Sequence, residues 1–364
     1  MPNSNNFRLG VRWLSIEDIM SRSKYSICYK KMLLIQMQNY LFVATLNILI
    51  LSGSNSAYAA SFSCTQASRP QEKFICQNEE VSQLDVALAK AYQEQMKVLP
   101  KDAQSLVQAS QRSWLTYWPM TCSASPIAIK LDATSKDCVL DAYRVRITEL
   151  NASALIEGRA TYNVSEYRYI APKTKDEKPS NHNISFPQIV VQSRNDAFLN
   201  TWLARDLNKW RSGLDVDSDT ALSVSLVSSS ITLLHAIEVQ YFFGHGAAHP
   251  QTNKAHLYFM QSAGRALNVS DFFADKRWAA TLANFVFKKL QQKLGDNLQV
   301  NTAKELIPLM SQPSSWSISK NSFGFEFNPY EVAPYSEGFV VIEVPLSLVR
   351  PYLTLFAKST FESK

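Results

Sequence analysis

Residues 84–99 read LDVALAKAYQEQMKVL, a stretch whose apolar side chains recur every three or four positions. That spacing places them on one face of an amphipathic helix, which is expected to end at Pro100. Two further helices are expected nearby, one capped by Asp102 and ending at Pro119, the other over 139–150. Three amphipathic helices predict a small all-α bundle.

The cysteines of the chain are unevenly placed. Cys28 stands near the beginning, and the other four fall within a short span: Cys64, Cys76, Cys122 and Cys138. An even number of closely spaced cysteines predicts disulfides in an oxidising compartment, and four cysteines allow three pairings. The local pairs Cys64–Cys76 and Cys122–Cys138 are favoured, since each closes a short loop and contributes about 3 kcal/mol. No C-x-x-C spacing points to zinc.

The first 59 residues have the order of a secretory signal. Basic residues at 22–31 precede the apolar run YLFVATLNILIL at 40–51, and Ser56-Ala57-Tyr58-Ala59 supplies small residues for a cut after Ala59. The apolar run is shorter than the ~20 residues of a comfortable membrane span. We expect a periplasmic protein whose only membrane contact is this segment before cleavage. An uncleaved anchor beginning near Met32 is the alternative.

Positive charge is concentrated ahead of the expected cut. Residues 1–59 hold six Lys or Arg and two Asp or Glu, a net of +4, which leaves +2 of the formal +6 for the rest. The rest also has no basic stripe of the kind that nucleic-acid binding needs. Composition therefore argues against DNA or RNA as the partner.

The second half of the chain mixes two periodicities. Apolar spacing predicts helices over 198–210 and 278–290, whereas alternation predicts a long strand over 231–243 and shorter ones at 323–327 and 339–344. Helices and strands in clusters, with hairpins, predict an α+β domain with an antiparallel sheet.

These patterns give a multidomain plan. The polar stretch PKTKDEKPSNHN at 172–183 is expected to be a loop between the helical and α+β parts. The expected parts are a signal peptide with an N-terminal extension at 1–59, a disulfide-stapled all-α domain at 60–151, a linker at 152–182 and the α+β domain at 183–364.

Three motifs of the helical region occur in one order with the four cysteines, two of them between Cys76 and Cys122 and the third after Cys138. They are Leu84-Asp85, Gln111-Arg112-Ser113-Trp114-Leu115 and Tyr143-x-x-Arg146-x-x-x-Leu150. In this combination residues 62–151 resemble the LprI-type lysozyme inhibitor N-terminal domain, which implies an envelope-located helical domain that binds and inhibits lysozyme. Family members often carry arginine soon after the Trp-Leu pair, where this chain has Thr116–Thr121. Asp85 and Arg146 also fit a buried ion pair between the first and third helices.

A second resemblance covers residues 183–355. Its matching stretches are Phe186–Ile189, Ala248–Pro250, Gly264–Phe273 and Phe325–Gly338. They resemble the extracellular part of RsiV-like anti-sigma factors and a related module attached to peptidoglycan deacetylases. In RsiV-like receptors this ectodomain binds lysozyme, so the resemblance implies a lysozyme-binding α+β domain. The chain has no sigma-binding segment after its membrane-like stretch, which argues against an anti-sigma role.

Catalytic motifs do not occur in the sequence. His245, His249 and His256 invite a metal site, but neighbouring glycines indicate a turn, and no H-E-x-x-H is present. Neither G-x-S-x-G nor a Gly-rich phosphate loop occurs. We expect no cofactor, no metal and no enzymatic activity. His235 is expected to be a hydrogen-bonded core histidine, and His249 to fix a loop.

Together the two resemblances predict a protein that binds a lysozyme-like glycoside hydrolase. A non-catalytic peptidoglycan-binding or envelope scaffold module is the alternative, and a hydrolase with an unrecognised site is a third reading. The candidate contact residues are Trp114 and Trp118, one helical turn apart, and Tyr330, Pro334 and Tyr335 in one loop. Each also has a structural interpretation, as core for the tryptophans and as a rigid turn for the loop.

Overall fold

The computed structural model describes residues 60–152, 155–156, 159–174, 177–229, 232–319 and 321–362. The expected signal at 1–59 and Ile231 of the expected strand lie outside these residues. The described backbone divides into two compact units, one holding Cys122–Glu149 and the described residues up to Gln93, the other holding Glu94–Thr121 and the described residues from Leu150 onward. Within the described ranges, no helix is both long and apolar enough to cross a membrane.

The first unit, here called the helical unit, is built from short and long helices joined by disulfides. Its elements are η1 Cys64–Gln66, α2 Pro70–Gln77, most of α3 Glu79–Val98, η2 Ala133–Ser135 and most of α5 Lys136–Asn151. The Glu72 carboxylate accepts from the N–H groups of Ser68 and Arg69 and so caps α2. Disulfides join Cys64 to Cys76 and Cys122 to Cys138, which confirms the predicted pairing.

Two buried polar residues of the helical unit have partners other than those expected. Asp85 accepts hydrogen bonds from the Tyr143 hydroxyl at 3.2 Å and from the Ser61 N–H at 2.8 Å. Arg146 pairs with Glu149 at 2.8 Å along its own helix. The expected Asp85–Arg146 pair is thus replaced by two separate contacts, because Tyr143, one turn earlier on α5, is the residue that reaches Asp85.

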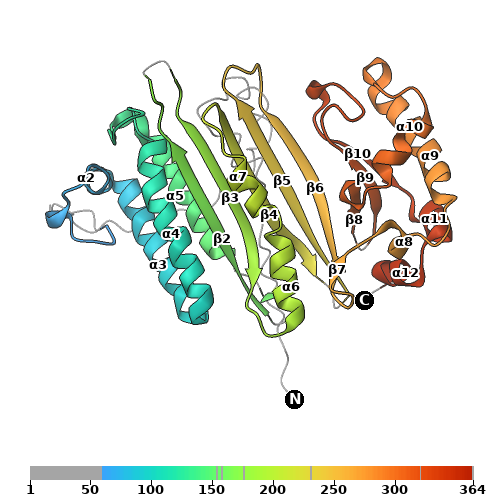
Figure 1. Cartoon of the computed structure of the whole chain (residues 1–364), viewed down its shortest axis with the longest axis horizontal. Coiled ribbons are helices and arrows are strands. Elements are labelled where there is room, and N and C mark those ends of the chain that lie inside the picture. The colour runs from blue at the N-terminus through green and yellow to red at the C-terminus, as the bar shows by residue number, and fades with distance from the viewer. Residues whose placement is uncertain are drawn as a thin grey trace, which may run out of the picture. The chain divides into compact units, whose positions relative to one another are not determined.

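A seven-stranded sheet forms the centre of the second unit, here called the sheet unit (Figure 1). Its strands lie in chain order: β1 Leu155–Ile156, β2 Arg159–Ile170, β3 Ser180–Ile189, β4 Ser218–Ser229, β5 Leu233–Gly244, β6 Gln251–Met260 and β7 Arg265–Ala266. All neighbours pair antiparallel except β3 and β4, which are parallel. The segment predicted as a linker at 152–182 contains β1 and β2, and β2 pairs with β3 along ten residues.

The parallel pair needs a crossover, and two helices supply it. They are α6 Arg194–Leu203 and α7 Leu207–Ser212, so the single helix expected over 198–210 is interrupted between them. Leu199, Leu203 and Trp210 from these helices pack with Ile184 and Phe186 of β3 in one buried cluster. The crossover helices therefore cover one face of the sheet (Figure 1).

Helix α4 Lys101–Thr121 belongs to the sheet unit and protects the edge of β2. The Ser110 hydroxyl accepts from the N–H of Ser165 at 3.0 Å. The Ser113 hydroxyl accepts from the N–H of Tyr167 at 2.9 Å and donates to its carbonyl oxygen at 3.0 Å. These side chains satisfy backbone groups that no described strand pairs. The helix continues to Thr121, past Pro119 where it was expected to stop, so it tolerates the one backbone hydrogen bond that a proline cannot donate.

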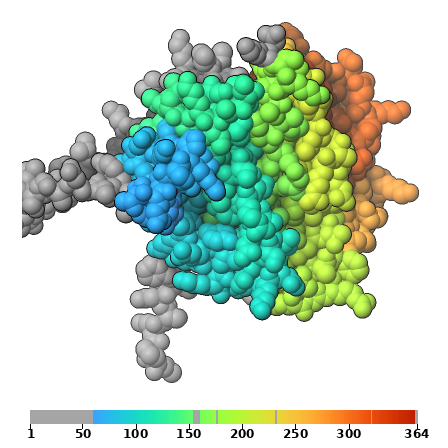
Figure 2. Space-filling model, turned by 60° about the vertical axis from the view of Figure 1, so that its left-hand side comes forward, coloured from blue at the N-terminus to red at the C-terminus, as the bar shows by residue number. Residues whose placement is uncertain are grey.

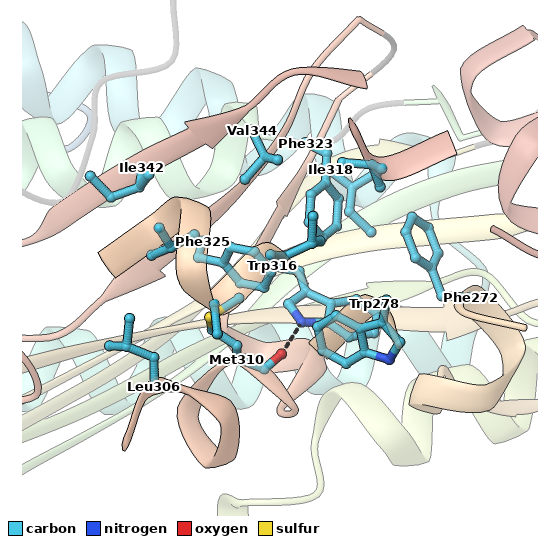
Figure 3. Close-up of a cluster of buried hydrophobic side chains, with 14 of the residues drawn as sticks. Phe272, Trp278, Leu306, Met310, Trp316, Ile318, Phe323, Phe325, Ile342 and Val344 are labelled. Atoms are coloured by element: carbon cyan, nitrogen blue, oxygen red, sulfur yellow. Dashed lines mark hydrogen bonds between the residues drawn. The ribbon is translucent and has the colours of Figure 1, made fainter. Parts of the chain in front are cut away.

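The rest of the sheet unit follows β7 and packs around aromatic side chains. Trp316, Phe323, Phe325 and Phe272 are fully buried, and the Trp316 Nε1–H donates to the Met310 carbonyl oxygen at 2.7 Å (Figure 3). The elements are α8 Val269–Phe272, α9 Trp278–Leu294, η3 Gly295–Asn297, α10 Ala303–Met310, η4 Pro313–Ser315, β8 Trp316–Ile318, β9 Phe323–Phe327, η5 Tyr335–Glu337, β10 Val340–Val344, α11 Leu346–Val349, η6 Arg350–Tyr352 and α12 Leu355–Glu362. Strands β8, β9 and β10 form a second, antiparallel sheet with β9 in its centre.

Candidate partner-binding site

The loop between β9 and β10 presents an exposed tyrosine in an unusual backbone conformation. Tyr330 has φ of 71° and is 54 % exposed. A bulky residue in the left-handed region is rare and costs about 1–3 kcal/mol, so the surrounding structure must hold it there. Such outliers cluster at ligand clamps and active sites, which makes this loop the leading candidate site.

His249, just before β6, supports the loop. Its ring stacks on Tyr335 with centroids 3.9 Å apart, and its Nε2 lies 3.1 Å from the Tyr330 hydroxyl. Because His249 Nδ1 donates to the Pro250 carbonyl oxygen at 2.9 Å, its Nε2 carries the lone pair that accepts from Tyr330. The sequence predicted that His249 fixes a loop, and the structure identifies which one. We call His249, Tyr330, Pro334 and Tyr335 the aromatic platform.

Backbone hydrogen bonds hold the platform in one conformation. The N–H of Tyr330 donates to the carbonyl oxygen of Ala333 at 3.0 Å, and the N–H of Gln299 donates to that of Val332 at 2.8 Å. Val332 and Ala333 are themselves buried, so the loop is anchored in the core. A loop fixed in this way loses little conformational entropy when a partner binds.

A chain of polar side chains joins the two sheets. Lys254 and His256 of β6 contact the two oxygens of Glu326 on β9, at 2.7 Å and 2.8 Å. The other nitrogen of His256 lies 2.9 Å from Nε2 of His235 on β5. His235 stacks on Tyr258 at 4.5 Å and is 6 % exposed, which confirms the predicted core histidine.

Burial and hydrogen bonding set the charges along this chain. Burial, and secondly the neighbouring charge of His256, lower the pKa of His235 to about 3. Burial alone would raise the pKa of Glu326, but hydrogen bonds from His256 and Lys254 outweigh it and hold that pKa below its ordinary value. At neutral pH the chain therefore contains an ionised Glu326 and an uncharged His235.

The three histidines that could suggest a metal site take part in different contacts. His245 lies 3.6 Å from Asp219, His249 belongs to the platform, and His256 contacts Glu326. Among the described residues, no three His, Cys, Asp or Glu side chains come close enough to hold a metal ion. These polar side chains thus connect β5 and β6 to β9.

The two tryptophans among the candidates are buried. Trp114 and Trp118 on α4 are 2 % and 1 % exposed, with ring centroids 6.0 Å apart. Both side chains therefore lie in the protein core. Tyr330, Pro334 and Tyr335 are brought together in one loop, and Tyr330 is the most exposed of them. The cation of Lys254, 4.9 Å from the Phe339 ring, is a neighbour that the sequence pattern did not reveal.

Two segments of the chain match models of known families. Residues 64–150 match "Lysozyme inhibitor LprI", and residues 270–347, which contain the platform loop, match "Protein of unknown function (DUF3298)". No curated protein matches the chain.

Solved structures of DUF3298 proteins also align with the chain. One from Bacteroides fragilis is 14% identical, with 57% of this chain and 98% of that chain covered and a TM-score of 0.45. One from Pseudomonas aeruginosa is 13% identical, with 56% and 98% covered and a TM-score of 0.43. By its family matches, this chain joins an LprI lysozyme inhibitor domain at residues 64–150 to a DUF3298 domain at residues 270–347.

Proposed function

We propose that this protein is exported to the periplasm, where it binds a lysozyme-type muramidase and inhibits it without chemistry of its own. The observation that carries the proposal is the match of residues 64–150 to the LprI lysozyme inhibitor family. The signal-like order of residues 1–59 supports export, and the two disulfides fit an oxidising compartment.

The aromatic platform is the proposed contact surface. Tyrosine is enriched at binding hot spots because a rigid ring buries a large area at a small entropic cost. Tyr330 is exposed, its loop is already ordered, and His249 fixes its hydroxyl. The residues after Ala59 carry a net charge of only +2, so electrostatic steering adds little and the contact rests on shape. We assign the Tyr330 ring to the substrate cleft of the muramidase.

A lysozyme assay on cell-wall substrate tests this proposal. The chain from Ala60 onward, oxidised and at micromolar concentration, should slow lysis by at least one of the c-, g- and i-type lysozymes. Tyr330→Gly should weaken inhibition at least tenfold, since a hot-spot tyrosine contributes 2 kcal/mol or more, roughly. Glycine adopts the left-handed φ freely, so this variant removes the ring without adding strain.

Phe198→Ala is the matched control, because Phe198 is also 54 % exposed, lies on α6 of the same unit and is outside the platform. If the Tyr330→Gly variant still inhibits fully, the contact surface does not lie on the aromatic platform. Absence of both inhibition and calorimetric binding with all three enzyme types would refute the function. Cosedimentation with purified sacculi without inhibition would favour the peptidoglycan-binding alternative, and lysis by the protein alone would contradict a non-catalytic role.

A further inference from the structure

Asp85 holds the first described segment of the chain in place. This residue of α3 is only 8 % exposed. One carboxylate oxygen accepts from the Tyr143 hydroxyl, and the other accepts from the backbone N–H of Ser61, 24 positions earlier in the chain. Tyr143 is almost fully buried, so it fixes the direction of the carboxylate. The oxygen that faces Ser61 is thus aimed at the peptide that follows the expected cut.

The charge of Asp85 is not balanced by these two donors. A hydroxyl and an amide N–H are neutral, and a carboxylate that is nearly removed from water is favoured by a positive partner close by. The two oxygens of a carboxylate can accept about four hydrogen bonds, so two contacts leave room for more. The site is therefore suited to one additional cationic donor at the Ser61 side.

The position of Ser61 identifies that donor. If the signal is cut after Ala59, residue 60 becomes the first residue and its nitrogen becomes an ammonium group. Neighbouring backbone nitrogens are separated by at most about 3.7 Å, given standard bond lengths. The nearby Cys64–Cys76 disulfide ties the same segment to α2. Ser61 is exposed and Ala60 is partly exposed, and Figure 2 shows the first part of the described chain, in blue, on the surface.

We propose that Asp85 binds the α-ammonium group created at Ala60 by signal cleavage, so that processing completes the fold of the helical unit. The inference rests on the export proposed above. It gives a role to the Leu84-Asp85 pair and to Tyr143, which the proposed lysozyme contact does not use. A chain that keeps its signal, or is cut elsewhere, lacks this ion pair.

Four proteins test the inference: chains that start at Ala60 or at one glycine before Ala60, each with Asp85 or with Asp85→Asn. With Asp85 present, the Ala60 start should melt at a higher temperature than the glycine-extended start. Its α-amine should also acylate about tenfold more slowly, because an ion pair that raises the amine pKa by about one unit lowers the free-amine fraction tenfold. In the two Asp85→Asn proteins, both differences should vanish.

A purely structural Asp85 would make the two starts equally stable and equally reactive, which overturns the inference. If Asp85→Asn does not fold, the acylation rates of the two Asp85 proteins still decide, since they share every residue from Ala60 onward. The mass of the protein exported from the full-length precursor separates the two proposals. A start other than Ala60 refutes the proposed cleavage, whereas an Ala60 start with no difference in rate refutes only the role of Asp85.

Discussion

The helical unit and the sheet unit are stabilised in different ways. The helical unit has two disulfides within a short stretch of chain, and its buried apolar side chains are few, with Val81 and Val139 the most completely covered. The sheet unit has no cysteine and instead buries Trp278, Trp316 and several phenylalanines in one cluster. One unit therefore depends on covalent cross-links and the other on packed aromatic area.

Size explains this difference. A small domain buries too little apolar surface to offset the entropy lost on folding, so small exported domains commonly carry disulfides. The sheet unit is long enough to enclose a core of its own and needs no cross-link. It follows that reducing agents, acid and edge mutations should act on different parts of the same chain.

Reduction should have the largest effect, and it should be confined to the helical unit. The two disulfides close loops with separations of 12 and 16 residues. Each stabilises by about 3 kcal/mol in the chain-entropy model, so losing both removes about 6 kcal/mol, more than a unit of this size can spare. Hydrogen exchange measured by mass spectrometry should show α2 and the first part of α3 unprotected, with α9, β9 and β10 still protected. Because Tyr330 lies in the sheet unit, inhibition of lysozyme through the aromatic platform should survive reduction.

The double variant Cys64→Ser/Cys76→Ser is the control for side effects of the reductant. It removes one loop and should cost about half as much as full reduction. Equal loss of protection in α9 and α2 on reduction would mean that the two units do not unfold separately.

Mild acid should have the next largest effect, and it should be strongest in the sheet unit. His235 has a folded pKa of about 3 against an ordinary value of 6.5. Below pH 6.5, His235 therefore binds a proton in the unfolded chain but not in the folded chain. The stabilisation that uncharged His235 contributes is complete above pH 6.5 and decreases as the pH falls toward 3. The loss is at most about 1.4 kcal/mol per pH unit, or roughly 2 kcal/mol between pH 6.5 and 5. Denaturant unfolding followed by tryptophan fluorescence measures it.

His235→Gln keeps a polar side chain beside His256 and removes the titration. Between pH 6.5 and 5, the unfolding free energy of this variant should change less than that of the wild type. The difference between the two slopes against pH should correspond to nearly one proton. Burial also lowers the pKa of His182, which adds a residual slope of the same sign in both proteins. The pKa of Glu326 lies below its ordinary value of 4.5, so its stabilisation is lost only under more acidic conditions. Parallel curves for wild type and variant would contradict the assigned role of His235.

Local patterns predicted much of the fold from the sequence. The spacing of the cysteines predicted their pairing because short loops close most readily, and apolar repeats predicted α3 and α9. The loop with Tyr330 was also a candidate from its aromatic content. Its left-handed φ was not predictable, because hydrogen bonds and burial in the folded loop impose that conformation against the preference of tyrosine.

The boundary between the units shows where local patterns fail. Residues 152–182 were expected to be a linker, yet β2 within them is a full partner of β3. The side chains of β2 alternate only weakly, and the α4 serine hydroxyls that bond to its backbone edge carry no apolar signal. Helix α4 in turn was expected in the helical domain, since its own amphipathic repeat does not reveal which surface it covers. Long-range pairing of this kind is decided by tertiary structure.

The smallest expected effect concerns the edge of β2 that α4 covers. Ser110→Ala/Ser113→Ala removes the hydroxyls that satisfy the backbone of Ser165 and Tyr167. Each lost hydrogen bond costs about 1 kcal/mol, partly recovered if water reaches the edge, so the sheet unit should lose about 1–2 kcal/mol. Exchange of the Ser165 and Tyr167 amides should become fast, with β5 and β6 unchanged. Ser105→Ala on the same helix is the matched control, because its hydroxyl bonds only to Lys101 of α4. Slow exchange at both amides in the double variant would show that α4 is not what protects the β2 edge.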